Sequence, residues 1–146
     1  MFRDGLLAGR RVVVGPSARP ALAGRLTALG AVLVAPDDGP HALVVDEPPG
    51  PDLVAWSGAV WERVRGLAAH PGAQLVLVAP PEGEAARAAL ENLARTLSIE
   101  WARFGIRTVC VAPGPSTPDA TVADVVAYLL SPAGDYFSGC RLDLGA

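Results

Sequence analysis

The sequence predicts an α/β fold: a shortened, doubly wound sheet of about six mostly parallel strands with helices on both faces. Short runs rich in valine recur along the chain, as expected for strands that are covered on both faces. Segments with helical spacing separate these runs, and such strand–helix–strand units give right-handed crossovers and parallel strands. A length of 146 residues suits one domain with a sizeable core, so residues 1–146 are expected to fold as a single unit.

Two short strands and the helix between them open the fold. The strands are expected at Arg11–Gly15 and Ala31–Val34. Pro20 suits the first turn of the helix, where its missing N–H is not needed, and Ser17 can cap that helix. The inner face of the helix is expected to consist of Leu22, Leu26 and Leu29.

A third strand at Ala42–Asp46 and a fourth at Leu75–Val78 enclose a helix that is expected over Leu53–Ala69. Trp56 and Trp61 are large side chains of this helix that can serve either the core or a contact with another chain. The apolar positions assigned to the inner face of this helix are Val54, Ala59, Val60, Val64 and Leu67.

The second half of the chain is organised around one long helix and the strand that follows it. The apolar positions of the helix recur at three- and four-residue steps, at Ala86, Leu90, Leu93, Leu97 and Trp101. Gly105 suits the left-handed conformation that ends many helices, and a strand is expected at Ile106–Val111. A final helix, capped by Thr117 or Thr121, and a last strand at Cys140–Leu144 complete the fold.

Two segments resemble the short-chain dehydrogenase/reductase family, particularly its ketoacyl-reductase-like branch. Ala88–Gly114 (AALENLARTLSIEWARFGIRTVCVAPG) is similar to the fifth helix and sixth strand of that family. Ala123–Ala146 (ADVVAYLLSPAGDYFSGCRLDLGA) is similar to its last helix and strand. The resemblance implies a Rossmann-like sheet in which the third expected strand takes the place of the family's fourth. Pro36 and Ala42 are too close for the family's own third strand and helix.

The loop that would hold a dinucleotide departs from the family's pattern. That pattern is Gly-x-x-x-Gly-x-Gly after the first strand, whereas the residues from Gly15 to Pro20 read GPSARP, with only the first glycine present. The two prolines also remove N–H donors that a phosphate would need. Asp37 lies near the position of a ribose-binding acid, but without the loop it is interpreted as a turn residue. We therefore expect no cofactor.

The catalytic positions of the family are also altered. With the AALENL segment held in register, the family's Ser, Tyr and Lys fall on Pro80, Gly83 and Arg87. Proline and glycine carry no hydroxyl, and the arginine has no tyrosine to act on. The segment after Pro113–Gly114 is too short for the family's substrate-covering loop. The sequence therefore predicts no catalytic, cofactor-binding or metal-binding residues.

Other polar residues offer weaker candidates for chemistry. Asp46 and Glu47 are paired carboxylates at the carboxyl end of a strand, where open α/β sheets place their sites. An acid–base role is possible there, although neighbouring strand residues point to opposite faces. His41 and His70 are interpreted as loop residues, and Tyr136 as a structural residue or a polar pocket group.

Composition limits the remaining classes. Hydrophobic residues make up 51% of the chain and charged residues 18%, which indicates either surface buried against another chain or many short buried strands. A net charge of −3 without a basic patch argues against nucleic acid. No apolar run is long enough for a membrane span, the opening MFRDGLLAGRR lacks a signal peptide's apolar region, and the two cysteines are expected to be reduced, so a cytoplasmic location is expected.

The resemblance also implies where another chain would bind. In the family, the fourth and fifth helices form one subunit interface and the last helix and strand form another. The outer face of the long helix carries small or weakly polar residues, which favours either close helix packing or an alanine-rich exposed helix. The expected interface residues are Trp56, Trp61, Ala85, Ala89, Asn92, Thr96, Ile99, Tyr136 and Leu142.

The sequence therefore favours a non-catalytic subunit that pairs with itself or with an active short-chain dehydrogenase/reductase paralogue and supports that partner. Two rival functions remain: a small enzyme with non-redox chemistry (a lyase, isomerase or cyclase), and a ligand-binding module. A deep apolar pocket beside Asp46–Glu47 would favour the rivals, whereas a filled sheet edge would favour the subunit.

Overall fold

A computed structural model describes residues 2–145; Met1 and Ala146, the ends of the expected single domain, lie outside the described residues. The strands are β1 (Arg11–Ser17), β2 (Val32–Leu33), β3 (Ala42–Asp46), β4 (Gln74–Val78), β5 (Arg107–Ala112) and β6 (Arg141–Asp143). The α-helices are α1 (Pro20–Ala28), α2 (Leu53–Val64), α3 (Glu84–Glu100) and α4 (Asp119–Leu130). Three short 3₁₀ segments, η1 (Arg65–Ala69), η2 (Ala102–Phe104) and η3 (Pro132–Tyr136), extend the helices or connect them to strands.

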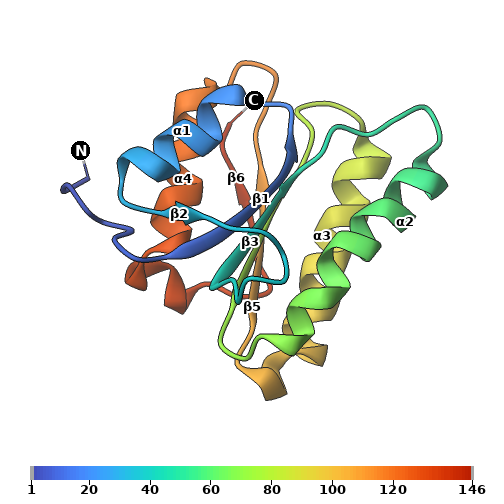
Figure 1. Cartoon of the computed structure of the whole chain (residues 1–146). Helices are drawn as coiled ribbons and strands as arrows, with labels where there is room; N and C mark the ends of the chain where they lie inside the picture. Colours follow the sequence, from blue (N-terminus) through green and yellow to red (C-terminus); the bar gives the residue numbers. More distant parts are fainter. Residues whose placement is uncertain (1, 146) are drawn as a thin grey trace.

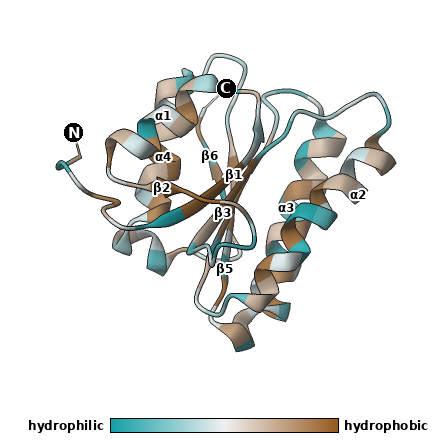
Figure 2. Ribbon diagram, viewed as in Figure 1, coloured by the Kyte–Doolittle hydropathy of each residue, from teal (hydrophilic) through white to brown (hydrophobic). Residues whose placement is uncertain are grey.

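All six strands lie in one parallel sheet, in the order β2-β1-β3-β4-β5-β6. Helices α1 and α4 cover one face of the sheet, and α2 and α3 cover the other (Figure 1). The structure therefore confirms the predicted fold class. The central strands are the most hydrophobic part of the molecule (Figure 2), and every residue of β3 and β4 is buried. Burial on both faces explains why these strands read as continuous apolar runs.

The strand order creates a switch point between β1 and β3. The chain leaves β1 through α1 to reach β2 on one side, and then returns across β1 to form β3 on the other. The connection over residues 34–41 contains no helix, which agrees with the expectation that no third helix fits there. Ligand sites of open α/β sheets lie outside the carboxyl ends of the strands at such a point.

The inner face of α2 differs from the predicted one. Val54 is 83% exposed and Ala59 is also exposed, so both assignments were wrong. Trp56 takes the inner position instead and is only 6% exposed. Asp52 caps the helix by accepting hydrogen bonds from the N–H groups of residues 54 and 55, which fixes where the helix starts. The buried stripe then runs through positions 56, 60 and 64, and the expected helix continues to Ala69 as η1.

Two predicted helix caps were also wrong. Ser17 belongs to β1, and Arg19 occupies the N-cap of α1 without a side-chain capping bond. Pro118 is the N-cap of α4. Thr117 instead closes the preceding turn, where its hydroxyl accepts a hydrogen bond from the Gly114 N–H. These hydroxyls satisfy backbone groups in turns, a use that competes with capping.

The long helix and its exit follow the prediction closely. Ala86, Leu90 and Leu97 are buried, while Ala94 replaces the half-buried Leu93 on the inner stripe. Gly105 has a φ of 69°, the left-handed conformation that favours glycine, and the chain turns there into β5.

Candidate functional site at the carboxyl edge of the sheet

A buried ion pair lies where β1 and β3 end. Asp46, the last residue of β3, is 3% exposed, and Arg19, just before α1, is 7% exposed. The Arg19 guanidinium pairs with the Asp46 carboxylate, and its Nε also lies 3.2 Å from an oxygen of Asp119 at the start of α4. Ser17 Oγ donates a hydrogen bond of 2.6 Å to Asp46. Burial raises the pKa of Asp46, and the Ser17 hydrogen bond and the Arg19 charge oppose that rise. The guanidinium group of Arg19 therefore lies at the switch point between β1 and β3.

The turn that carries Arg19, between β1 and α1, has its N–H groups already occupied. The Ala18 N–H donates to the Asp46 carbonyl at 3.1 Å, and the Arg19 N–H donates to Ser17 Oγ at 3.0 Å. Pro20 has no N–H to offer. A pyrophosphate needs free N–H donors at a helix N-terminus, so the residues of this turn do not fit the dinucleotide group that such a fold can bind.

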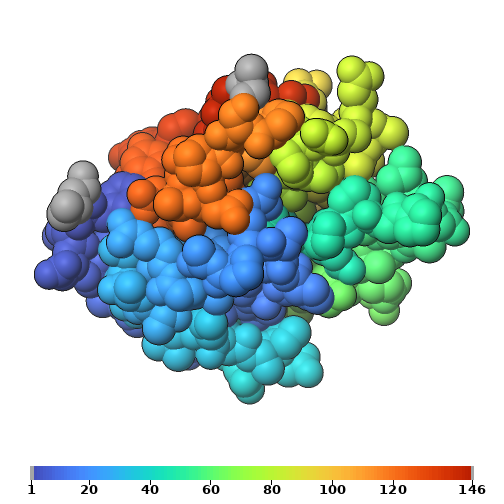
Figure 3. Space-filling model, turned by 90° about the horizontal axis from the view of Figure 1, so that it is seen from above, coloured from blue at the N-terminus to red at the C-terminus, as the bar shows by residue number. Residues whose placement is uncertain are grey.

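Arg87 occupies the position expected for a catalytic lysine, but it binds the protein itself. Its Nη1 donates to the carbonyl of Pro80 at 2.7 Å and to that of Pro113 at 2.6 Å. Arg87 therefore joins the segments that follow β4 and β5. Gly83 is the N-cap of α3, with a φ of 92°, and it offers no proton donor at the expected tyrosine position. Figure 3 looks down on this edge, where the segments that follow β1, β3, β4 and β5 meet.

Comparison with solved structures identifies the fold. A short chain dehydrogenase from Mycobacterium smegmatis matches with a TM-score of 0.75 and 16% identity, over 100% of this chain and 95% of that chain. The citronellol catabolism dehydrogenase AtuB of Pseudomonas aeruginosa PAO1 gives 0.71 and 20%, over 98% and 96%. The 3-alpha-hydroxysteroid dehydrogenase from Pseudomonas sp. B-0831, solved with NADH, gives 0.73 and 19%, over 93% and 94%. No protein-family model matches the sequence.

The chain has the short-chain dehydrogenase fold. At identities of 20% or below, these matches establish the architecture and leave the chemistry to the residues present. The placement of β3 directly beside β1 agrees with the expectation that the third strand takes the place of this fold's fourth.

Asp46, the last residue of β3, and Glu47, which follows it, do not form an acid–base pair in this short-chain dehydrogenase fold. Asp46 faces Arg19 and the start of α4, whereas Glu47 pairs with Arg63 of α2 at 2.6 Å. The alternation of side chains along a strand separates them onto opposite faces. Each carboxylate is neutralised by an arginine, so neither is free to act as a general base.

The two histidines do not contribute to this edge. His41 directly precedes β3, at the opposite end of that strand, and its Nδ1 accepts a hydrogen bond from the Arg11 N–H at 3.0 Å. Burial and the nearby Arg11 and Arg10 charges lower the pKa of His41. His70 lines a separate cavity, together with Asp37. Within residues 2–145, no three His, Cys, Asp or Glu side chains gather in a way that could hold a metal ion.

The expected interface residues fall into two groups. Trp61, Ala89, Asn92 and Thr96 line one groove of about 360 Å³ between α2 and α3. Trp56 also lines this groove, although most of its side chain is buried and its Nε1 donates to the Glu47 carbonyl.

The other expected contacts lie beyond this groove. Ala85 and Ile99 extend the exposed stripe along α3, and Ile99 is 76% exposed. Tyr136, exposed in η3, and Leu142, half-buried in β6, lie elsewhere on the molecule. Among the helices that the structure describes, none combines the length and apolar character needed to cross a membrane.

Sequence reasoning missed the role of Arg19. The available signal was an arginine inside the shortened turn after the first strand, with an aspartate at the end of the third strand. Because parallel strands present their carboxyl ends at the same edge, these two residues were candidates for an ion pair.

Proposed function

We propose that this protein is a non-catalytic subunit with a short-chain dehydrogenase fold, which pairs with itself or with an active paralogue through the outer faces of α2 and α3. In such a complex it stabilises its partner by mass action, because it binds only the folded partner. The groove between α2 and α3 is the observation that carries the pairing.

The polar contacts at the carboxyl edge support catalytic silence. A redox site of this fold needs donors for the cofactor phosphates and a proton donor for the substrate. Here the N–H groups of the β1–α1 turn are bound internally, and Arg87 donates to two backbone carbonyls. These groups serve the stability of the fold rather than a substrate.

The outer surface of α2 and α3 supports pairing. Two large apolar side chains, Trp61 and Ile99, are exposed there. The small side chain of Ala89 lines the groove with Trp61, and Ala85 is exposed at the start of α3. Trp61 is held by stacking on Trp101, with ring centroids 6.5 Å apart, so this face is preformed. Small residues let a second helix pair approach closely, and the aromatic ring supplies an anchor of the kind that dominates interface energies.

The direct test is the mass of the particle in solution. Size-exclusion chromatography with light scattering is expected to give a dimer, or a complex when an active paralogue is co-expressed. Ala89→Glu places a charge inside the groove and is expected to weaken pairing at least about tenfold. Ala28→Glu is a matched control, because Ala28 is an exposed alanine at the end of α1. A strict monomer that captures no paralogue contradicts the pairing.

The proposed silence needs a separate test. Titration with NADH or NADPH, followed by fluorescence, is expected to show no saturable binding to the purified chain. Tight uptake of either dinucleotide contradicts the proposal, whatever the result of the mass measurement.

The structure gives different support to the two rival functions, a small non-redox enzyme and a ligand-binding module. Asp46 is enclosed, so a pocket for non-redox chemistry at that residue is not favoured. The ligand-binding rival keeps one observation in its favour, because a cavity lies on the α2 side of the sheet and includes Gly15 and Arg63, the partner of Glu47.

A further inference from the structure

A cavity of about 370 Å³ lies between the sheet and the end of α2. The cavity exists because the connection between β2 and β3 contains no helix that could cover β1 on the face of the sheet that carries α2. The β1 and β3 side chains Val13 and Leu43 form its floor, and Pro36 and Pro40 of the connection contribute to its rim. Leu67 of η1 lies opposite. The volume and the apolar lining match those of small-molecule sites.

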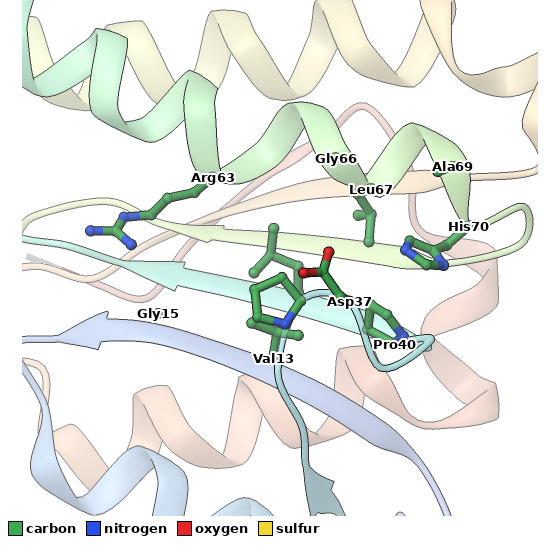
Figure 4. Close-up of a pocket in the computed structure, with 11 residues that line it drawn as sticks. Val13, Gly15, Asp37, Pro40, Arg63, Gly66, Leu67, Ala69 and His70 are labelled. Atoms are coloured by element: carbon green, nitrogen blue, oxygen red, sulfur yellow. The ribbon is translucent and has the colours of Figure 1, made fainter.

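The polar groups of the cavity are few and differ in their availability. Figure 4 shows the Asp37 carboxylate directed from the connection toward η1, with the His70 imidazole at one end of the cavity and Arg63 at the other. Arg63 is already paired with Glu47 at 2.6 Å. Among residues 2–145, neither the Asp37 nor the His70 side chain makes a hydrogen bond or ion pair. Asp37 is therefore the carboxyl group left to a ligand.

The charge balance of the cavity favours a cation. Arg63 and Glu47 cancel, which leaves the Asp37 charge uncompensated. The wall opposite Asp37 consists mainly of Gly66, Leu67 and Ala69 of η1 and adds no further acidic side chain. An apolar body can lie between Leu43 and Leu67 while a cationic group reaches Asp37.

From these contacts we propose that the cavity binds a small primary amine with an aromatic or otherwise apolar body, its ammonium group donating to the Asp37 carboxylate. The site is distinct from the Arg19–Asp46 pair at the carboxyl edge and from the α2–α3 groove, so it goes beyond the pairing function. Other occupants, such as an anionic ligand or a neutral ring, are alternatives that the experiment distinguishes.

Tryptamine and indole-3-propionate provide the test, because they share an indole ring and carry opposite charges. Calorimetric titration of the full chain near neutral pH is expected to show saturable tryptamine binding and at least fivefold weaker binding of indole-3-propionate. Asp37→Asn is expected to weaken tryptamine binding about three- to fivefold, as befits an exposed ion pair. The control Asp38→Asn removes the same charge from the next residue, which does not line the cavity, and should leave binding unchanged.

A steric variant tests the location. Gly66 lines the cavity, and a Cβ there would meet no atom within 4 Å, so Gly66→Phe should fold and obstruct the site. Its expected result is loss of tryptamine binding with an unchanged melting temperature. Failure of tryptamine to bind the unmodified chain overturns the proposal. Equal affinity for the two indoles, or a Gly66→Phe variant that folds and still binds normally, overturns it as well.

Discussion

Removal of the Arg19 guanidinium is expected to destabilise the fold strongly. In Arg19→Met the Asp46 carboxylate stays buried, with only the Ser17 hydroxyl as a donor. Breaking a buried pair by removing one partner costs about 3 kcal/mol or more, because a charge is left uncompensated. For a chain of this length, that loss corresponds to a decrease of about 10 °C in melting temperature.

The pH dependence of the stability of Arg19→Met gives a more specific test. The folded pKa of Asp46 is raised above its ordinary value of 3.8, chiefly by burial, and Arg19 opposes that rise. A raised carboxyl pKa means that the ionised form costs stability above the folded pKa, and that the cost disappears as the pH falls through it. Without Arg19 the pKa rises further. The stability deficit of Arg19→Met relative to the unmodified protein should therefore shrink as the pH falls from neutral toward the ordinary aspartate pKa of 3.8.

Thermal denaturation followed by circular dichroism measures both effects. Arg25→Met is the matched control, because the Arg25–Asp124 pair, at 2.7 Å, is partly exposed, and its loss should lower the free energy of unfolding by under about 1 kcal/mol. A second substitution, Asp46→Asn, should restore at least about 1.5 kcal/mol to Arg19→Met by removing the unpaired charge. Equal losses in Arg19→Met and Arg25→Met, or no rescue by Asp46→Asn, would refute this account of the edge.

Three further predictions concern packing at two glycines, the hydrogen bonds of Arg87 at the carboxyl edge, and a buried thiol. Gly134→Ala should lower the free energy of unfolding, measured by urea denaturation, by more than about 3 kcal/mol, because its Cβ would lie 1.7 Å from the Leu129 carbonyl oxygen. Gly58→Ala, which has open space around it in the middle of α2, should raise that free energy by about 0.5 kcal/mol. Arg87→Met should lower the free energy of unfolding by about 2 kcal/mol, because two backbone carbonyls lose their donor, and Arg87→Lys should recover part of that loss. Equal stability of these two variants would contradict the stabilising role of the Arg87 hydrogen bonds. Burial raises the pKa of Cys110 to about 11, so iodoacetamide near pH 8 should label this thiol, as mapped by mass spectrometry, only after denaturation; labelling in the folded protein would show that β5 opens locally.

The strands could be predicted from sequence because burial on both faces leaves a local mark. The runs at Ala42–Val45 and Leu75–Val78 are apolar at consecutive positions, and the structure buries all of them. Gly105 was predictable for a similar reason, since a left-handed residue after a helix strongly favours glycine.

The polar arrangement of the edge could not be predicted in the same way. Arg19 and Asp46 are separated by 27 positions, and their pairing depends on β3 lying beside β1. The inner face of α2 was mispredicted because Val54 was assigned to it, although the four-residue spacing of Trp56, Val60 and Val64 marks the buried stripe. The cavity near Asp37 exists because the connection between β2 and β3 contains no helix. The absence of a helix leaves no pattern in the residues that line the cavity.

The bare connection between β2 and β3 has a consequence for engineering. In the sheet formed by residues 2–145, β2 is the outermost strand and pairs with β1 alone, so the interior strands do not depend on what lies beyond it. A strand and helix grafted between Ala35 and Gly39 would enlarge the sheet at its margin without disturbing any existing ladder. The fold can thus gain or lose such a peripheral unit as a module, and the domain offers a natural point of attachment for building larger α/β proteins.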